Sequence, residues 1–141
     1  MARSCVAVLD IGKTNVKLNA VSRAGAILET VSTANPTLPG PPYRHPDLAG
    51  IEDWFFAELG PLARRHDIGT IVATGHGSSG VLVGEDGPVM PSVDYENDVP
   101  ADLNALYAAD AGPIEERGSP IMPGAAHLAR QMLWLEREWP K

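Results

Sequence analysis

The sequence of 141 residues contains a single cysteine, Cys5, so an internal disulfide framework cannot form. Basic residues are also few: 11 Lys and Arg stand against 18 Asp and Glu, which gives a formal net charge of −7. Because binding along nucleic-acid phosphates requires clustered positive charge, we expect no nucleic-acid partner. The apolar runs are too short for a signal-peptide core or a membrane span, so we expect a cytoplasmic protein without membrane contacts.

What the sequence does contain is typical of a globular chain. Hydrophobic residues make up 44% of the sequence and charged residues 21%, which allows a buried core. The length suits one domain or one lobe of a larger protein. Cys5 lies in an apolar run at residues 5–9, where we expect it to be a small buried hydrophobic residue.

Three extended segments open the chain. Residues 5–9 are rich in valine, as in a strand buried on both faces, and residues 16–21 alternate apolar with polar side chains. A turn that includes Gly25 leads into a third extended segment, residues 26–34. Three consecutive strands joined by tight turns predict an antiparallel β-meander.

The rest of the chain mixes loops, helices and one more strand. Asp47 or Asp53 is placed to cap the first helix, and the pair Gly60 and Pro61 is expected to interrupt it. The order β-β-β-α-β begins with a hairpin, so it predicts a mixed α/β sheet and not a dinucleotide-binding start. The segments expected are a proline-rich loop at 35–46, helices at 54–63, 103–111 and 125–138, a buried strand at 68–73 and a loop at 113–124.

The tip of the predicted first hairpin carries the most informative group of residues. Asp10 ends a buried strand, where a carboxylate can hold Mg²⁺ through water. Gly12 removes a side chain where the backbone must pass close to another group, and Lys13, Thr14 and Asn15 present an ammonium, a hydroxyl and an amide. This grouping suits the β- and γ-phosphates of a nucleotide.

The same residues also allow a simpler interpretation. Gly, Asn and Asp dominate ordinary turns, so the segment from Asp10 to Asn15 is equally typical of a polar hairpin turn. It is neither a Walker A loop nor a three-glycine dinucleotide fingerprint. Lys17 lies two residues beyond Asn15 and is either a charge near the phosphates or a solvated strand residue.

The hairpin pattern resembles the first phosphate motif of the actin-like ATPases, and the whole chain resembles the FGGY carbohydrate kinases among them. Besides the hairpin, the resemblance covers residues 73–77 at a strand end, the segment 91–98, and the stretch 118–140. It implies a ribonuclease H-like mixed sheet that opens with the meander. It also implies that residues 1–141 are the N-terminal portion of the first kinase domain.

The resemblance implies a kinase that transfers the γ-phosphate of ATP, with Mg²⁺, to a hydroxyl of a ketose or polyol. Asp10 would position Mg²⁺, and the ATP phosphates would lie against Gly12, Lys13, Thr14, Asn15 and Lys17. The sugar would be bound by His76, Ser78, Ser79, Asp94, Tyr95 and Glu96. For this acidic segment, and for Glu96 and Asp98 in particular, a surface acidic loop is the alternative interpretation. The remaining histidines, His45, His66 and His127, show no pattern of metal ligands.

In this family the general base and the second phosphate segment lie well downstream of the matched residues, so we expect this chain alone to be inactive. Three hypotheses follow: part of a sugar kinase, a phosphate- or sugar-binding module without catalysis, or a structural protein that kept the fold. The first is favoured over the third because Asp10 and Lys13 are both present. A sheet that lacks its usual neighbours would expose an apolar face, through which the chain would self-associate.

Overall fold

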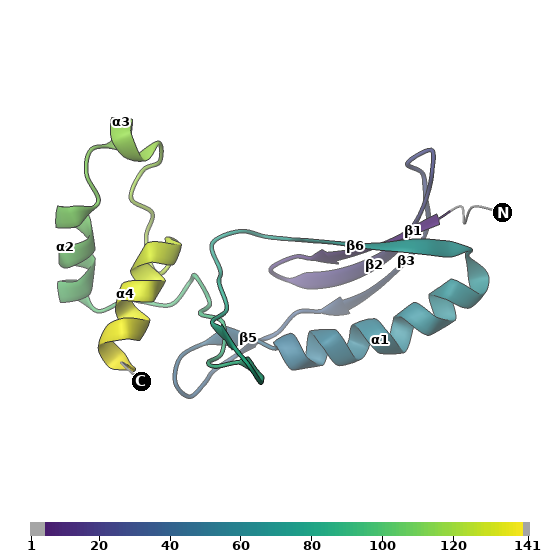
Figure 1. Cartoon of the computed structure of the whole chain (residues 1–141), viewed down its shortest axis with the longest axis horizontal. Coiled ribbons are helices and arrows are strands. Elements are labelled where there is room, and N and C mark those ends of the chain that lie inside the picture. The colour runs from purple at the N-terminus through teal and green to yellow at the C-terminus, as the bar shows by residue number, and fades with distance from the viewer. Residues whose placement is uncertain (1–4, 140–141) are drawn as a thin grey trace. The chain divides into compact units, whose positions relative to one another are not determined.

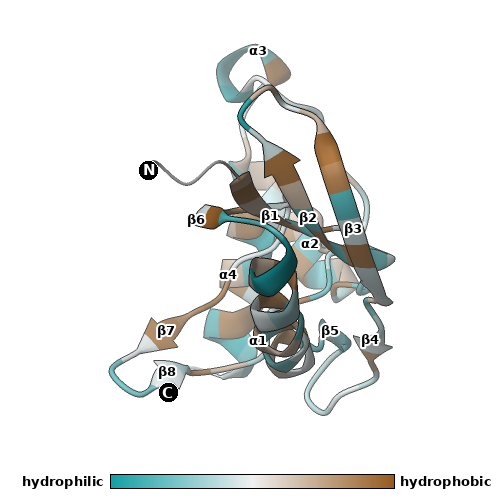
Figure 2. Ribbon diagram, turned by 90° about the vertical axis from the view of Figure 1, so that its right-hand side faces the viewer, coloured by the Kyte–Doolittle hydropathy of each residue, from teal (hydrophilic) through white to brown (hydrophobic). Residues whose placement is uncertain are grey.

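The first three strands form the antiparallel meander that the sequence predicts. The computed structural model describes residues 5–139, and in it β1 (Cys5–Ile11), β2 (Asn15–Ser22) and β3 (Ile27–Ala34) pair antiparallel in that order. β1 and β2 are each two residues longer than predicted, and β3 begins one residue later than predicted. From Glu29 to Ala34, half-buried and exposed residues alternate along β3, which lies at one edge of the sheet (Figure 2), as expected for a strand with one solvated face.

The fourth strand, β6 (Ile68–Gly75), pairs parallel with β1, so the sheet has the order β3-β2-β1-β6. This mixed sheet confirms the predicted fold class. The expectation of a buried strand at residues 68–73 is wrong, because β6 lies at the sheet edge and only Ile68 is buried. Valine and isoleucine in sequence indicate a strand, but they do not show whether a further strand lies beside it.

One long helix, α1 (Leu48–Arg65), lies along one face of this sheet (Figure 1). Asp47 is the N-cap, and its Oδ1 accepts a hydrogen bond from the Gly50 amide at 2.9 Å. The predicted interruption at Gly60 and Pro61 is wrong, since the helix continues through Pro61 and the next residue, Leu62, is fully buried. The core between α1 and the sheet consists of Cys5, Ala7, Leu18, Ala20, Leu62 and Ile68.

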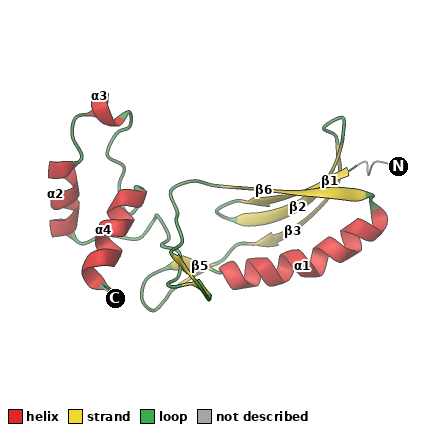
Figure 3. Ribbon diagram, viewed as in Figure 1, coloured by secondary structure: helices red, strands yellow, loops and turns green. Residues whose placement is uncertain are grey.

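The sheet and α1 belong to the first of two compact units, which comprises Met1–Thr37 and Asp47–Gly77. The second unit comprises Leu38–Pro46 and Ser78–Lys141 and joins its helices by long loops (Figure 3). Its helices are α2 (Ala101–Asp110), α3 (Ile114–Arg117) and α4 (Leu128–Glu138). The short strand pairs are β4 (Thr37–Leu38) with β5 (His45–Pro46), and β7 (Val83–Gly84) with β8 (Gly87–Pro88).

The second unit has its own core around aromatic rings. The Tyr43 ring lies 5.5 Å from that of Trp134 and 5.4 Å from that of Trp139, between ring centroids. The Tyr43 hydroxyl donates to the Pro91 carbonyl at 2.6 Å. The proline-rich segment therefore contributes a buried aromatic residue, Tyr43, to this core. The other buried apolar residues of this core are Val93, Val99, Leu103 and Ala125.

Two predictions in the second unit are corrected. The helix expected from residue 125 begins at Leu128, because the Ala125 amide donates to the Tyr95 carbonyl and Gly124 has a left-handed φ of 56°. The one-turn helix α3 lies inside the expected loop. Among the described residues, no helix is long and apolar enough to cross a membrane.

Candidate functional site

The tip of the first hairpin, residues 12–15, is tightly closed. The Gly12 amide donates to the Asn15 carbonyl at 3.0 Å. A Cβ atom added to Gly12 would lie 2.9 Å from that same carbonyl oxygen, closer than side-chain carbons approach. Glycine is therefore required here by the close approach of two backbone segments, as the sequence predicts.

Asp10 lies at the base of this hairpin on the sheet face opposite α1. Its register partners are Lys17 on β2 and Thr74 on β6. Side chains alternate along a strand, and Ala7 faces α1, so Asp10 and Lys17 share the other face. The Asp10 side chain is partly exposed, and within residues 5–139 its carboxylate takes part in no hydrogen bond or ion pair. A carboxylate without such a partner is available to bind a ligand.

Lys13 is half-buried, whereas Thr14, Asn15 and Lys17 are exposed. The sequence places the first three at the hairpin tip, and the structure does the same. Lys17 points from the strand beside Asp10 and not from the tip. Both of its sequence interpretations, a charge near the phosphates and a solvated strand residue, are compatible with that position.

The sequence analysis missed Asn35, which holds the hairpin tip from the end of β3. Its side-chain Nδ2 donates to the Gly12 carbonyl at 2.8 Å, and its backbone amide donates to the Thr14 carbonyl at 2.8 Å. Asn35 is only 7% exposed. The one signal in the sequence is an asparagine that directly follows a strand and precedes a proline, which by itself predicts no more than a loop.

His76 follows β6 and lies at the base of the same hairpin. Its backbone amide donates to the Ile11 carbonyl at 3.2 Å, and its ring Nδ1 lies 3.1 Å from that oxygen. Since a carbonyl only accepts, Nδ1 carries the proton in this contact. The structure therefore brings His76 together with Asp10 and the hairpin tip in the first unit.

The donor set around the hairpin fits Mg²⁺ better than a transition metal. No group of three or more His, Cys, Asp or Glu side chains among the described residues gathers in a way that would hold a metal ion. Mg²⁺ commonly uses only one or two carboxylates and completes its shell with water and substrate phosphates. Asp10 offers one partly exposed carboxylate, which is the kind of group that such a site needs.

The other predicted sugar-binding residues lie in the second unit. Ser78 has a left-handed φ of 66°, and its carbonyl accepts a hydrogen bond from Gln131 Nε2 at 2.7 Å. Ser79 is exposed. Gln131 also donates to the Ala125 carbonyl at 2.6 Å and is 1% exposed, so it fixes the backbone on which Ser78 lies. The sequence analysis missed Gln131, although it is a polar residue within a predicted amphipathic helix.

Asp94, Tyr95 and Glu96 form a loop in which the three side chains have different surroundings. The Asp94 side chain is 1% exposed, its Oδ1 accepts from the Glu96 amide at 3.0 Å, and its Oδ2 lies 3.6 Å from the Arg44 guanidinium. Tyr95 is half-buried and Glu96 is exposed. Asp94 is therefore placed to shape the loop, while Tyr95 and Glu96 are the members that a ligand can reach.

Arg44 was also missed by the sequence analysis. It is half-exposed and lies between the buried Asp94 and the exposed Glu96, 4.0 Å from the carboxylate of Glu96. Asn97 orders this arrangement, since its Nδ2 donates to the carbonyls of Arg44 and Asp94, both at 2.8 Å. A buried carboxylate requires such compensation. Arg44 and Asn97 lie 53 residues apart in the chain, so no local pattern reveals their contact.

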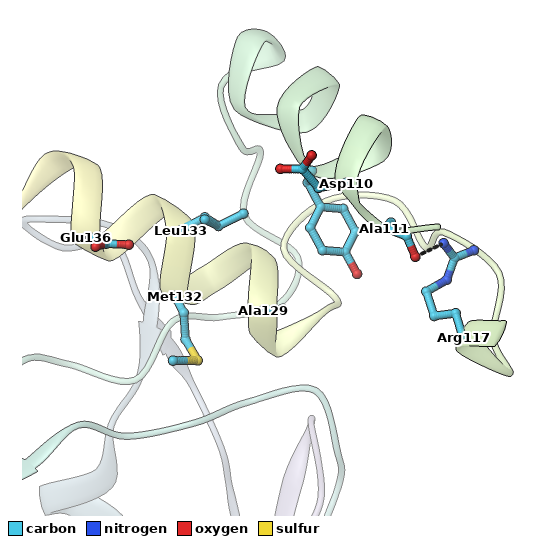
Figure 4. Close-up of a pocket in the computed structure, with 8 residues that line it drawn as sticks. Asp110, Ala111, Arg117, Ala129, Met132, Leu133 and Glu136 are labelled. Carbon is cyan, nitrogen blue, oxygen red and sulfur yellow. Dashed lines mark hydrogen bonds between the residues drawn. The ribbon is translucent and has the colours of Figure 1, made fainter. Parts of the chain in front are cut away.

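A cavity of about 510 Å³ lies between α2 and α4, as Figure 4 shows. Met132 and Leu133 give it an apolar side, and Asp110 and Glu136 give it two carboxylates. Arg117 also lines the cavity, but its guanidinium donates to the carbonyls of Ala111 and Gly112 at 3.2 and 3.0 Å. None of the predicted site residues lines this cavity.

Comparison with known proteins shows that the fold of this chain is similar to that of sugar kinases. No protein-family model matches the chain, and no curated protein matches it. Solved structures do match. A carbohydrate kinase from Novosphingobium aromaticivorans is 26% identical with a TM-score of 0.91, and the match covers 99% of this chain and 30% of that one.

The chain has the fold of part of an FGGY-type carbohydrate kinase. A xylulose kinase from Rhodospirillum rubrum is 25% identical over 96% of this chain and 30% of its own, with a TM-score of 0.73. A glycerol kinase from Plasmodium falciparum with ADP shares the fold at a TM-score of 0.74 and 11% identity, over 98% of this chain and 29% of its own. The resemblance to this family and the fold class are confirmed. The chain spans about 30% of the length of these kinases.

Proposed function

We propose that this chain is the N-terminal part of an ATP-dependent sugar kinase that phosphorylates a hydroxyl of a ketose or polyol. The observation that carries the proposal is the untied Asp10 carboxylate at the base of a tight, glycine-dependent hairpin. The likeness to carbohydrate kinases over nearly the whole chain supports it. The ADP in the glycerol kinase structure supports a nucleotide as the phosphate donor.

In this proposal the hairpin holds the end of the nucleotide. Mg²⁺ bound to ATP would neutralise the charge that shifts from the γ-phosphate to the leaving ADP. Asp10 would hold that ion through its coordinated water, and Lys13 with the backbone amides of the tip would bind phosphate oxygens. The exposed hydroxyl of Thr14 and amide of Asn15 would add polar contacts at the same place.

In the second unit, the sugar would be held by Ser78, Ser79, Tyr95 and Glu96, with Asp94 and Arg44 ordering the loop that carries the last two. The sugar hydroxyl attacks the γ-phosphorus, the bond to the bridging oxygen of ADP breaks, and the hydroxyl proton passes to a base. That base lies outside this chain in the proposal. The isolated chain should therefore bind its ligands weakly and turn over no ATP.

Titration calorimetry with Mg-ATP tests the role of the hairpin. Wild-type chain is expected to bind Mg-ATP, and Asp10→Asn to weaken the binding by about tenfold, since a carboxylate near a cation contributes on the order of a kilocalorie or more. Asp86→Asn, which removes an exposed carboxylate from the turn between β7 and β8, is the matched control and should bind as wild type does. Equal affinity of wild type and Asp10→Asn would contradict the proposal.

A further inference from the structure

Asn35 contacts the hairpin tip at two points, and both contacts involve backbone carbonyls. The Nδ2 group donates to the carbonyl of Gly12 and the main-chain amide donates to the carbonyl of Thr14, each at 2.8 Å. The two carbonyls belong to alternate residues of the tip. They are therefore fixed in direction by a single residue that lies 23 positions away from Gly12 in the chain.

The direction of a carbonyl determines the direction of the next amide. A trans peptide is planar, and its C=O and N–H groups point to opposite sides. Because the Gly12 and Thr14 carbonyls point toward Asn35, the amides of Lys13 and Asn15 point away from it. Two amides of one turn that face the same side form a concave anion site of the kind that binds phosphate.

The buried side chain of Asn35 has one further feature. Its Oδ1 accepts no hydrogen bond from any residue that the structure describes, although Asn35 is 7% exposed. Turning the amide over would satisfy nothing, because Oδ1 would then face the Gly12 carbonyl oxygen. The contact with Gly12 thus requires a donor, which aspartate or leucine at this position would lack.

We infer that Asn35 is a positioning residue for the nucleotide. By its two hydrogen bonds it orients the amides of Lys13 and Asn15 toward the phosphates. This inference rests on the proposed function of the hairpin. Asn35 touches no phosphate itself in this arrangement, so its effect is on the affinity for the anion and not on the chemistry. It adds to the hairpin a residue directly after β3 that no local sequence motif includes.

The chain offers a matched control at Asn104 in the second unit. Asn104 Nδ2 also donates to a backbone carbonyl, that of Val99 at 3.0 Å, and its Oδ1 is likewise buried without a partner among the described residues. Asn35→Ala and Asn104→Ala therefore remove the same kind of bond from different units. A general loss of stability would affect both variants, whereas a loss of anion affinity should follow only Asn35→Ala.

The test is titration of the full chain with Mg²⁺-tripolyphosphate and with Mg-ATP, followed through the ¹⁵N and ¹H shifts of the Lys13 and Asn15 amides. Asn35→Ala is expected to raise both dissociation constants by about tenfold, and Asn104→Ala to leave them within about twofold. Wild-type affinity in Asn35→Ala would overturn the inference and leave the proposed function intact. No binding by the wild type would contradict the proposed function itself.

A second measurement on the wild type decides the case if Asn35→Ala does not fold. A scalar coupling across the hydrogen bond between the Asn35 side-chain nitrogen and the Gly12 carbonyl carbon is expected. Slow exchange of the Asn35 side-chain amide should accompany it. Absence of the coupling together with rapid exchange would overturn the inference without any variant.

Discussion

At the scale of single residues, the hairpin depends on atoms that a side chain would displace. Gly12 has the Asn15 carbonyl oxygen 2.9 Å from the place where its Cβ would be, and that oxygen belongs to the backbone, which cannot rotate away. Gly77 offers a contrast, since a Cβ there would meet nothing within 4 Å. Glycine is therefore required by steric contact at position 12, whereas no such contact requires it at position 77.

Gly12→Ala is expected to lower the free energy of unfolding by roughly 1–3 kcal/mol, because the hairpin must open to admit the methyl group. Gly77→Ala should change it by less than about 0.5 kcal/mol, as substitutions away from special contacts usually do. Urea denaturation followed by circular dichroism measures both. Equal stability of the two variants would show that the tip is not as tight as the structure has it.

At the scale of elements, a cluster of three charged or titratable groups joins β3 to the end of α1. Arg65 Nε donates to Glu29 Oε2 at 3.0 Å, and His66 Nε2 lies 2.8 Å from the same oxygen. These hydrogen bonds, first that of Arg65 and then that of His66, lower the pKa of Glu29 from 4.5 to about 2. The cluster also places a basic side chain, Arg65, in the last turn of α1, where its positive charge interacts favourably with the negative end of the helix dipole.

The lowered pKa of Glu29 predicts how stability depends on pH. A carboxylate that ionises more readily in the folded state contributes fully above its unfolded pKa, near 4.5, and loses that contribution as the pH falls through about 2. Glu29→Gln should therefore be less stable than wild type at neutral pH, and the difference should shrink on acidification. Denaturant titrations at neutral and acidic pH measure this difference.

The matched control for Glu29→Gln is Glu85→Gln, which removes the same charge from the exposed turn between β7 and β8. Its stability relative to wild type should stay nearly constant over the same pH range. A pH-independent difference for Glu29→Gln would show that the cluster does not form in solution.

At the scale of the whole molecule, β6 is an edge strand, because no further strand among residues 5–139 pairs with its outer side. Ile71 and Val72 on this strand are 52% and 47% exposed, on opposite faces of the sheet. An edge strand with unpaired backbone groups and exposed apolar side chains is a template for pairing with another chain. Since the chain spans about 30% of the kinases it resembles, we expect β6 to pair with a second copy when no other segment is present.

Ile71→Lys is expected to reduce self-association, because a charged side chain at an edge strand opposes pairing. Sedimentation velocity over a range of protein concentrations would show association of the wild type and a monomer for the variant. Ile114→Lys, at an exposed position of α3 in the second unit, should associate as wild type does. A wild-type chain that stays monomeric at all concentrations would contradict the expectation.

The sequence by itself determined the elements whose signals are local. The period of two in β2, the extended segment at 26–34, the turn at Gly25 and the polar tip from Gly12 to Asn15 all depend on neighbours in the chain. The meander and the candidate phosphate site could therefore be predicted. The family resemblance added the expected roles of residues in both units. Helix α1 was predicted too short mainly because its start was placed at Trp54, whereas Asp47 caps a helix that begins at Leu48.

Only the tertiary structure decided which residues hold these parts in place. Asn35 meets Gly12 across 23 residues, Asn97 meets Arg44 across 53, and Gln131 meets Ser78 across 53. The exposure of β6 likewise depends on a strand order that joins β1 to a segment 63 residues later, from Cys5 to Ile68. Hydrogen bonds between distant segments form because folding places unpaired buried groups side by side, and propensity and periodicity carry no information about that pairing.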